Sequence, residues 1–491
     1  MMTRSRPSRV YILMLQPSSQ RPALVWLSGD LRLDDQPALA AIGERPALIV
    51  YVDDDGGRPL GGASRWWLHH SLCALSKGIA ARGGRLDILQ GNAEALIPAI
   101  ARAAGASDVF WGRRYGGGDV FRLTRLRAAL EDAGIATQSF NTHLMREPWE
   151  VTAGDKRPYK VFTPFWRSHR ALGPLAAPLP APEHFVAAPW SDAAPARTDL
   201  TGLALLPTKP DWSGGLAAAW VPGEAAAQAR LSAFLESALA AYANKRDFPD
   251  GDFTSRLSPH LAFGELSPRR IAHAVEAAAA CEPAFARSAE KFLSELGWRD
   301  FDYGLLYAAP DLATRAWTEK FASFPFRDDE AAFSAWTKGQ TGYPLVDAGM
   351  RELWTTGYMH NRVRMVAASF LVKHLLIDWR RGEQWFWDTL CDADEANNPA
   401  NWQWVAGSGA DAAPYFRIFN PALQGQRFDA NGDYVRRWVP ELADVDGATI
   451  YAPRRSGTTL GRGYREPIVE HDFARRRALA ALASLSARPS D

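Results

Sequence analysis

Cysteine is scarce in this sequence, and its distribution excludes two kinds of cross-linked architecture. Only three cysteines, Cys73, Cys281 and Cys391, stand in 491 residues. Their odd number and wide spacing suit neither a disulfide framework nor a zinc cluster, and they are typical of a reducing compartment. No apolar run reaches membrane-spanning length, and the apolar stretch Val10–Leu15 is too short for a signal peptide. We therefore expect a soluble, cytoplasmic protein without a metal site or a membrane partner.

An excess of charge is also missing. The formal net charge is +1, so a nucleic-acid site would have to be a local arginine patch. A glycine-rich phosphate loop is missing too, because residues Ser28–Leu31 after the first expected strand do not form one, and this disfavours a dark nucleotide or flavin oxidoreductase. Hydrophobic residues make up 47% of the chain, and 19 tryptophans are present. This length and composition predict two or three globular domains.

Two kinds of pattern divide the chain. Residues 1–22 are expected to be a disordered extension, and residues 23–150 alternate short apolar strands with helical stretches such as Ser64–Arg82, which predicts a doubly wound α/β domain with a parallel sheet. Residues 151–225 are rich in proline and alanine and predict a wrapping or loosely ordered connector. Helical periodicity dominates residues 226–486, which predicts an all-α domain. The expected strands are Ala23–Ser28, Ala47–Val52, Leu86–Leu89 and Asp108–Trp111.

The densest polar and aromatic pattern lies between Gly357 and Pro421. Within the expected helix Gly357–Trp379, the side chains of Asn361, Arg364 and Met365 share one sector. Such a sector predicts either a helix facing a polar cavity or an ordinary solvated face. The following loop brings carboxylates, amides and tryptophans so close together that a large polar and aromatic cofactor would supply the partners they need. These residues are Asp392, Asp394, Asn397, Asn398, Trp402, Gln403 and Trp404.

The segments TGYMHNRVRMVAASFLVKHLLIDW, DADEANNPANWQW and DAAPYFRIFNP resemble the flavin-binding half of the photolyase/cryptochrome family. The similarity is greatest to class I cyclobutane pyrimidine dimer photolyases. It extends to SGDLRLDDQPALAAI near the N-terminus, to TSRLSPHLAFGELSP and to EPIVEHDFAR. The resemblance implies an N-terminal antenna domain and a C-terminal domain that holds FAD non-covalently.

The resemblance also implies which residues contact FAD. The TSRLS segment and Tyr242 would hold the phosphates, which is reasonable because Ser and Thr before a helix leave amide donors for an anion, although plain N-capping at Ser258 remains the alternative. Arg364 and Asp392 would form an ion pair over the isoalloxazine, Asp394 would reach the ribityl–adenine region, and Asn398 would lie opposite flavin N5. Plant cryptochromes have Asp at that last position, so the amide favours repair over signalling. The full expected set is Tyr242, Thr254, Ser255, Arg256, Leu257, Ser258, Arg299, Arg364, Asp392, Ala393, Asp394 and Asn398.

For the lesion, the resemblance implies light-driven repair of a flipped-out dimer in UV-damaged DNA by electron transfer from excited reduced FAD. Glu295 would hydrogen-bond the dimer base, and Trp298 and Trp404 would clamp it. The (6-4) photolyases carry His where this chain has Asn361 and Met365, so we expect the cyclobutane dimer as substrate. His360 cannot substitute, because one step along a helix turns a side chain about 100° away. The cations and donor expected to contact DNA are Arg246, Arg362, Arg417 and Gln424.

Photoreduction and light harvesting depart from the family pattern. Trp402 and Trp379 match the first two members of an electron relay, but the third position falls on Phe326. Either a gap hides the third Trp or another aromatic such as Trp387 or Tyr358 ends the relay. Trp385 and Trp387 lie on the same expected helix as Trp379, so a rerouted chain is possible. The antenna site reads RRYGGGD, with Gly116 where an acidic residue is typical of a folate site. Asp119 could substitute for it, and the three glycines also suit a flat ring close to the backbone. Methenyltetrahydrofolate, an 8-hydroxy-deazaflavin or no antenna all stay open, with folate favoured.

A cryptochrome-like blue-light photoreceptor is the main alternative to a repair enzyme. Cryptochromes often carry long C-terminal tails, whereas few residues follow the expected last helix Ala474–Ser486, and this disfavours signalling. We expect a monomer.

Overall fold

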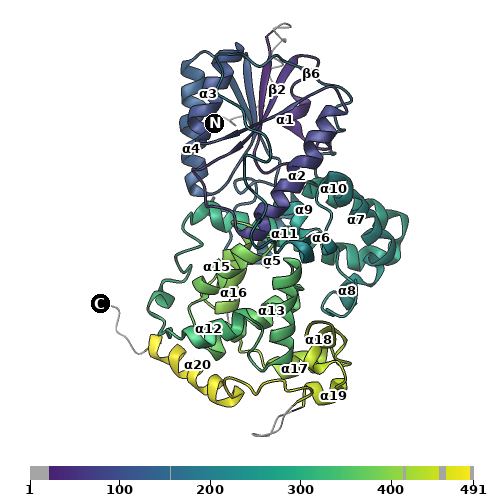
Figure 1. Ribbon diagram of the computed structural model, residues 1–491, viewed down its shortest axis with the longest axis vertical. Helices are drawn as coiled ribbons and strands as arrows, with labels where there is room; N and C mark the ends of the chain where they lie inside the picture. The colour runs from purple at the N-terminus through teal and green to yellow at the C-terminus, as the bar shows by residue number, and fades with distance from the viewer. Residues whose placement is uncertain (1–20, 155, 413–415, 453–459, 487–491) are drawn as a thin grey trace, which may run out of the picture.

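The computed structural model describes residues 21–154, 156–412, 416–452 and 460–486. Most of the expected extension at residues 1–22 therefore lies outside the described residues. A β-sheet with its helices forms one end of the molecule, and a larger group of helices forms the other end (Figure 1). None of the helices in the described ranges is both long enough and apolar enough to span a membrane.

The sheet is parallel and has the strand order β3-β2-β1-β4-β5. Its strands are β1 (Ala23–Leu27), β2 (Pro46–Asp53), β3 (Leu86–Gln90), β4 (Asp108–Gly112), β5 (Ala136–Phe140) and the short β6 (Val186–Ala187), which pairs with β2. All five β1 residues are buried, as expected for a central strand with both faces covered. Strand β5 was not predicted from the sequence, because ATQSF has little apolar content at the edge of the sheet.

Helices cover both faces of this sheet. Figure 1 shows α3 (Ala93–Ala104) and α4 (Gly117–Asp132) on one side, and α1 (Pro37–Ala40) and α2 (Gly62–Ala80) on the other. This arrangement confirms the doubly wound α/β prediction. Residues at or just after the carboxyl ends of β1, β2 and β4 face the helical part, where α2 contacts α15.

The stretch expected to be a loose connector contains ordered elements. It holds α5 (Phe162–Ala171), β6 and α6 (Gly214–Ala219), and it ends where α7 (Glu224–Ser237) begins. Phe162 and Phe165 of α5 are buried in a cluster that also contains Phe301. The segment therefore contributes to the packing of the helical part and does more than join two domains.

The helical part confirms the all-α prediction. Its helices are α7 to α20, namely α8 (Tyr242–Lys245), α9 (Ser258–Ala262), α10 (Pro268–Cys281), α11 (Ala286–Ala308), α12 (Glu330–Thr337), α13 (Pro344–Thr356), α14 (Asn361–Ser369), α15 (Trp379–Thr389), α16 (Asn397–Ala406), α17 (Pro421–Phe428), α18 (Asp433–Trp438), α19 (Gly447–Ile450) and α20 (His471–Ser486), in addition to α7. Short 3-10 turns lie at η1 (Leu239–Ala241), η2 (Pro283–Phe285), η3 (Glu319–Ser323) and η5 (Pro440–Leu442), and a π-helical turn lies at η4 (Phe370–His374).

The prediction of a continuous helix over Gly357–Trp379 was wrong. Gly357 ends α13 in the left-handed conformation, with φ 66°, and α14 starts only at Asn361. The helix then widens into the π turn η4 and breaks before Asp378, which caps α15. Asn397 and Asn398 were expected in a loop but form the first turn of α16.

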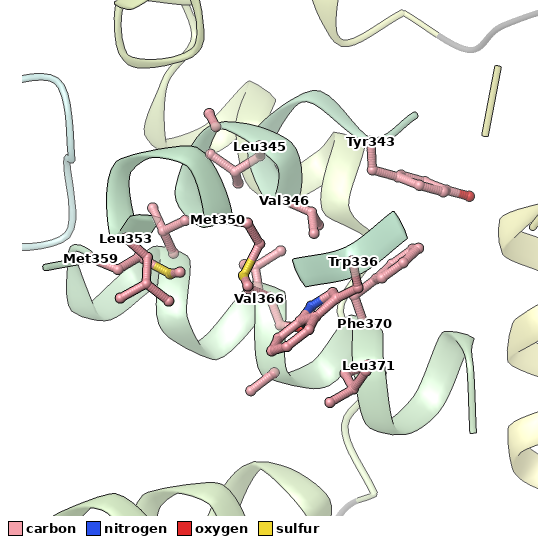
Figure 2. Packing of buried hydrophobic residues seen from close by; sticks show 14 of the residues in the cluster. Trp336, Tyr343, Leu345, Val346, Met350, Leu353, Met359, Val366, Phe370 and Leu371 are labelled. Atoms are coloured by element: carbon pink, nitrogen blue, oxygen red, sulfur yellow. The ribbon is translucent and has the colours of Figure 1, made fainter. Parts of the chain in front are cut away.

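The largest core cluster extends from α12, α13 and α14 to α15, α16 and α18. Trp336 is fully buried there beside Val366, Phe370 and Leu371 (Figure 2). A second cluster joins the two ends of the molecule, because Trp67 of α2 packs in one cluster with Tyr358 and Phe263 of the helical part. This second cluster holds the sheet domain in a defined position against the helices that form the site.

Candidate functional site

A cavity of about 470 Å³ opens in the helical part. Helices α8, α9, α11, α14 and α16 supply its walls, together with the loop that precedes α16. The predicted site residues that line it are Tyr242, Arg246, Ser255, Ser258, Glu295, Trp298, Arg299, Asn361, Arg364, Met365, Asp392, Asp394, Asn398, Trp402 and Trp404. Residues taken from five separate segments of the sequence are thus brought to one cavity.

One face of α11 forms a wall of this cavity. Glu295, Trp298, Arg299 and Asp302 are spaced at intervals of three, four and seven, so their side chains share a helical face. Asp302 is buried and was not named from the sequence, although the same spacing would have found it. Burial and the nearby charge of Asp394 raise the pKa of Asp302 well above its usual value. Asp302 therefore retains a proton more readily than an exposed carboxyl group.

Arg364 and Asp392 form a bidentate ion pair at the cavity wall. The two guanidinium-to-carboxylate distances are 3.0 Å and 2.8 Å. Burial opposes the charge on Arg364, but the carboxylate and its hydrogen bonds raise the pKa of that guanidinium. The Ser258 hydroxyl donates to Asp392 at 2.6 Å. Plain N-capping by Ser258 is therefore not what the structure shows, since α9 has no side-chain cap bond.

Asp394 is held from several directions. It accepts from the Tyr303 hydroxyl at 2.8 Å and from the Asn397 side-chain amide at 2.8 Å. The backbone N–H groups of Ala396 and Asn397 also donate to it. This carboxylate therefore has a fixed orientation at the start of α16.

Asn398 has its amide orientation determined by Glu383 of α15. The Asn398 Nδ2 donates to the Glu383 backbone oxygen at 3.0 Å and to its carboxylate Oε1 at 2.8 Å. The reverse orientation would put an amide oxygen against two acceptors and is excluded by repulsion. Consequently the amide oxygen of Asn398 is the atom available to a group in the cavity, and it can only accept a hydrogen bond.

The TSRLS segment is only partly at the cavity. Ser255 and Ser258 line it, whereas Thr254, Arg256 and Leu257 do not. Leu257 is buried in a neighbouring cluster, and the Arg256 guanidinium lies 4.5 Å from the ring centre of Trp220. Roles for these three residues in binding FAD stay predictions, as does that of Ala393, which lines a different cavity.

The two positions predicted to select the lesion lie together on α14. Asn361 and Met365 both line the cavity, one helical turn apart. His360 is the N-cap of α14, where its ring accepts from the Arg362 backbone N–H at 3.2 Å. Burial lowers the pKa of His360 to about 4, and the residue does not line the cavity. It therefore offers no acid to a bound molecule.

The expected DNA-contacting cations lie at and around the cavity. Arg246 pairs with Glu295, and Lys291 also pairs with that carboxylate at 2.9 Å. Arg362 pairs with Asp247 at 2.9 Å and does not line the cavity. Arg417 and Gln424 also lie outside the lining, and Arg417 is exposed beside Trp404, 5.9 Å from the ring centre.

Trp298 has a partner that the sequence did not reveal. The ring of Phe162 in α5 stacks on it at 3.9 Å with an interplanar angle of 9°. Phe162 does not line the cavity, so it supports Trp298 from behind. The residue was overlooked because it stands in the segment read as a connector.

The positions predicted to form an electron relay lie in different surroundings. Trp402 is buried against Phe386 at 4.9 Å and Trp336 at 6.2 Å, and Gly382 lets α15 approach it, since a Cβ there would lie 2.2 Å from its ring. Trp379 and Phe326 share a small pocket. Beyond α15, Trp385 stacks on Trp354 at 5.7 Å, and Trp354 is 64% exposed. Trp336 and Trp354 were not named from the sequence, because only their contacts distinguish them from core tryptophans.

A second cavity of about 610 Å³ lies between the sheet domain and the helical part. Asp119, Arg58 and Trp387 line it, together with the carboxyl end of β2. The space expected for a flat ring at the three glycines is partly taken, because a Cβ on Gly117 would lie 2.2 Å from Pro310. An antenna pigment in this second cavity stays a prediction.

The first cavity fits FAD in size and chemistry. Its volume lies within the range of cofactor sites, and its walls combine tryptophans with carboxylates, amides and an arginine. The indole nitrogen of Trp402 is buried and has no hydrogen-bond partner among the described residues. Arg364, Asp392, Asp394 and Asn398 would hold the cofactor, with Ser255 and Ser258 at its phosphates.

Comparisons with known proteins agree with this geometry. Residues 23–183 match the family model described as DNA photolyase, and residues 292–484 match the FAD binding domain of DNA photolyase. The chain is 47% identical to a deoxyribodipyrimidine photo-lyase of Agrobacterium fabrum over 94% of this chain and 98% of that protein. It is 36% identical to cryptochrome-2 of Arabidopsis thaliana over 93% of this chain and 78% of that protein. A crystal structure titled as a class III photolyase from Agrobacterium tumefaciens matches with a TM-score of 0.90 and 46% identity, covering 97% of this chain and all of that one.

Proposed function

Because this chain belongs to the photolyase/cryptochrome family, we propose that it is a deoxyribodipyrimidine photolyase, which repairs cyclobutane pyrimidine dimers in DNA with FAD and light. The FAD-binding domain is present, and the curated relative from Agrobacterium fabrum is named for this activity. We predicted a class I enzyme from the sequence, whereas the similar crystal structure is titled as a class III photolyase. The subclass therefore stays a prediction.

The observation that carries the proposal is that residues predicted to bind FAD and residues predicted to bind the dimer line one cavity. Asp392 and Asn398 belong to the first group, and Glu295 and Trp298 belong to the second. A dimer flipped out of the duplex would enter the cavity and meet Trp298 and Trp404 as stacking surfaces. The chemistry that bound, reduced FAD supplies is donation of an electron after it absorbs light, which opens the cyclobutane ring and is followed by return of the electron.

The chain's own residues would orient both partners. Glu295, held by Arg246 and Lys291, would reach the dimer base and accept a hydrogen bond from its ring N–H, which fixes the position of the base. Asn361 and Met365 bring no acid to the lesion, which favours the cyclobutane dimer over the (6-4) product. Arg362, Arg417 and Gln424 would contact the flanking phosphates.

A blue-light photoreceptor is the second candidate, because the chain also resembles plant cryptochrome-2. One experiment separates the two. Purified, reduced, FAD-loaded protein is incubated with DNA that carries either cyclobutane dimers or (6-4) products, under blue light and in the dark. We expect light-dependent loss of the cyclobutane dimers alone. Absence of any loss would favour the photoreceptor, and loss of the (6-4) product would refute the assigned lesion. The absorbance spectrum of the same sample shows which antenna is bound.

A further inference from the structure

Glu383 is a buried carboxylate that is contacted from both ends of the molecule. Its side chain is 1% exposed in the middle of α15. Asn398 of α16 donates to its Oε1 at 2.8 Å. Arg58 donates from Nη1 to the same oxygen at 2.7 Å and from Nη2 to Oε2 at 2.8 Å. A carboxylate so deeply buried requires a cation, and Arg58 supplies it in bidentate geometry.

Arg58 belongs to the sheet domain. It stands in the loop between β2 and α2, 325 positions away from Glu383 along the chain. This loop is seated on α15 by further contacts. The Arg58 guanidinium lies 4.0 Å from the ring centre of Trp387, and the Trp387 indole N–H donates to the Pro59 carbonyl at 2.8 Å. Asp388 accepts from the Gly62 backbone N–H at 2.8 Å.

We propose that Arg58 is a positioning residue of the sheet domain that acts on the flavin through Glu383 and Asn398. The inference rests on the proposed FAD site. By pairing with both carboxylate oxygens, Arg58 holds Glu383 in the rotamer that accepts from Asn398. The Asn398 amide oxygen would thereby stay available to N5 of bound FAD, from which it would accept a hydrogen bond when that nitrogen carries a hydrogen.

Removal of Arg58 would leave an uncompensated buried charge, which is strongly unfavourable. Glu383 would then take up a proton or turn toward another cation. Either change weakens or removes the carboxylate acceptor and leaves the Glu383 backbone oxygen as the main group that orients the Asn398 amide, so the amide could rotate more easily. Arg58 and Trp387 also line the second cavity, so the same loop faces the space between the domains and controls the flavin amide.

The test compares Arg58→Met with a control at the same interface. Asp388→Ala removes a different contact at this interface, the one with the Gly62 N–H at the start of α2, without touching Glu383. In the FAD-loaded full chain, the rate at which the photoreduced flavin reoxidises in air is followed by absorbance, and its reduction potential is measured. We expect reoxidation to be about tenfold faster in Arg58→Met, as for loss of one hydrogen bond to a charged group. Arg58→Lys should restore part of the difference, and Asp388→Ala should match the wild type.

A double-mutant cycle shows whether Arg58 acts through Glu383. In a Glu383→Gln background the buried carboxylate charge is gone, so Arg58→Met should change the reoxidation rate no further. For the same reason, the double variant should fold even if the single variant Arg58→Met does not. An equal effect of Arg58→Met with and without Glu383→Gln would overturn the proposal, as would a wild-type rate in Arg58→Met or an equal acceleration in Asp388→Ala. These rates need no DNA. A wild type that binds FAD but repairs no dimer would therefore refute the proposed function alone, and one that binds no FAD would refute both.

Discussion

Trp298 combines exposure to the cavity with support from Phe162 on its other side. The nearly parallel rings at 3.9 Å limit the rotation of Trp298, so its surface is presented to a base without further ordering. Recognition by a preorganised ring costs less side-chain entropy than recognition by a mobile one.

We predict that Trp298→Ala lowers affinity for dimer-containing DNA by about tenfold to a hundredfold, which corresponds to the loss of one base–aromatic stack. Phe162→Leu should give a smaller loss, because the wall stays apolar but the stack is gone. A filter-binding titration with a dimer-containing oligonucleotide measures both. Trp212, which is 43% exposed and lies outside the lining of the cavity, provides the control Trp212→Ala. An equal loss in that control would contradict the assignment.

Phe326, at the predicted third position of the relay, also matters as a single residue for photoreduction. Phenylalanine is much harder to oxidise than tryptophan, and here it shares a pocket with Trp379. We predict that Phe326→Trp speeds flavin photoreduction, measured by absorbance under blue light with an added thiol. If electrons instead enter through the stacked pair Trp354 and Trp385, Trp354→Phe should slow photoreduction while Phe326→Trp changes nothing.

Among the elements, the π turn η4 departs most from what the sequence suggests. It places Lys373 in the interior, 2% exposed, where its ammonium group donates to the Arg417 backbone carbonyl. Burial, with a smaller contribution from the charge of Arg417, lowers the pKa of Lys373 to about 7. An extra residue per turn of this kind is frequent at functional sites.

This pKa predicts a stability that depends on pH. In the unfolded chain Lys373 holds its proton up to about pH 10.4. The folded state therefore binds fewer protons between about pH 7 and pH 10, and this group makes the free energy of unfolding rise with pH across that window. Below pH 7 the full penalty of charging the buried lysine remains.

Lys373→Met removes this penalty and one hydrogen bond. We predict that the Tm of the variant minus the Tm of the wild type is more positive at pH 6 than at pH 9.5. The difference between the two conditions should correspond to at most about 4 kcal/mol. Calorimetry of both proteins at both pH values measures it. The opposite order of the two differences would show that folding raises the pKa of Lys373 instead of lowering it.

Elements also show what the sequence could and could not predict. The strands of the sheet core could be identified, because β1 and β2 are continuous apolar runs. The edge strand β5 and helix α5 could not, because their residues are mixed in polarity or lie among prolines. The cavity residues on α11 and α14 share helical faces and could be found. Glu383 and Phe162 could not be found, because their roles depend on contacts between segments that are remote in sequence.

At the scale of the whole molecule, the proposed function requires a protein with a net charge of +1 to bind a polyanion. Several arginines around the cavity are already paired, Arg246 with Glu295 and Arg362 with Asp247. Arg417 is exposed beside Trp404, and its backbone carbonyl is held by Lys373. An exposed cation at a fixed place near the cavity mouth is well suited to contact a phosphate.

We therefore predict that Arg417→Gln weakens binding of dimer-containing DNA and reduces the slope of log K against log salt by about 0.9, the value expected for one phosphate contact. The same titration at several salt concentrations measures both effects. Arg102, exposed in the last turn of α3 on the sheet domain, provides the matched variant Arg102→Gln with the same change in net charge. If net charge governed binding, the two variants would behave alike. A change in slope confined to Arg417→Gln would mean that a nearly neutral protein binds DNA through the local field at its cavity.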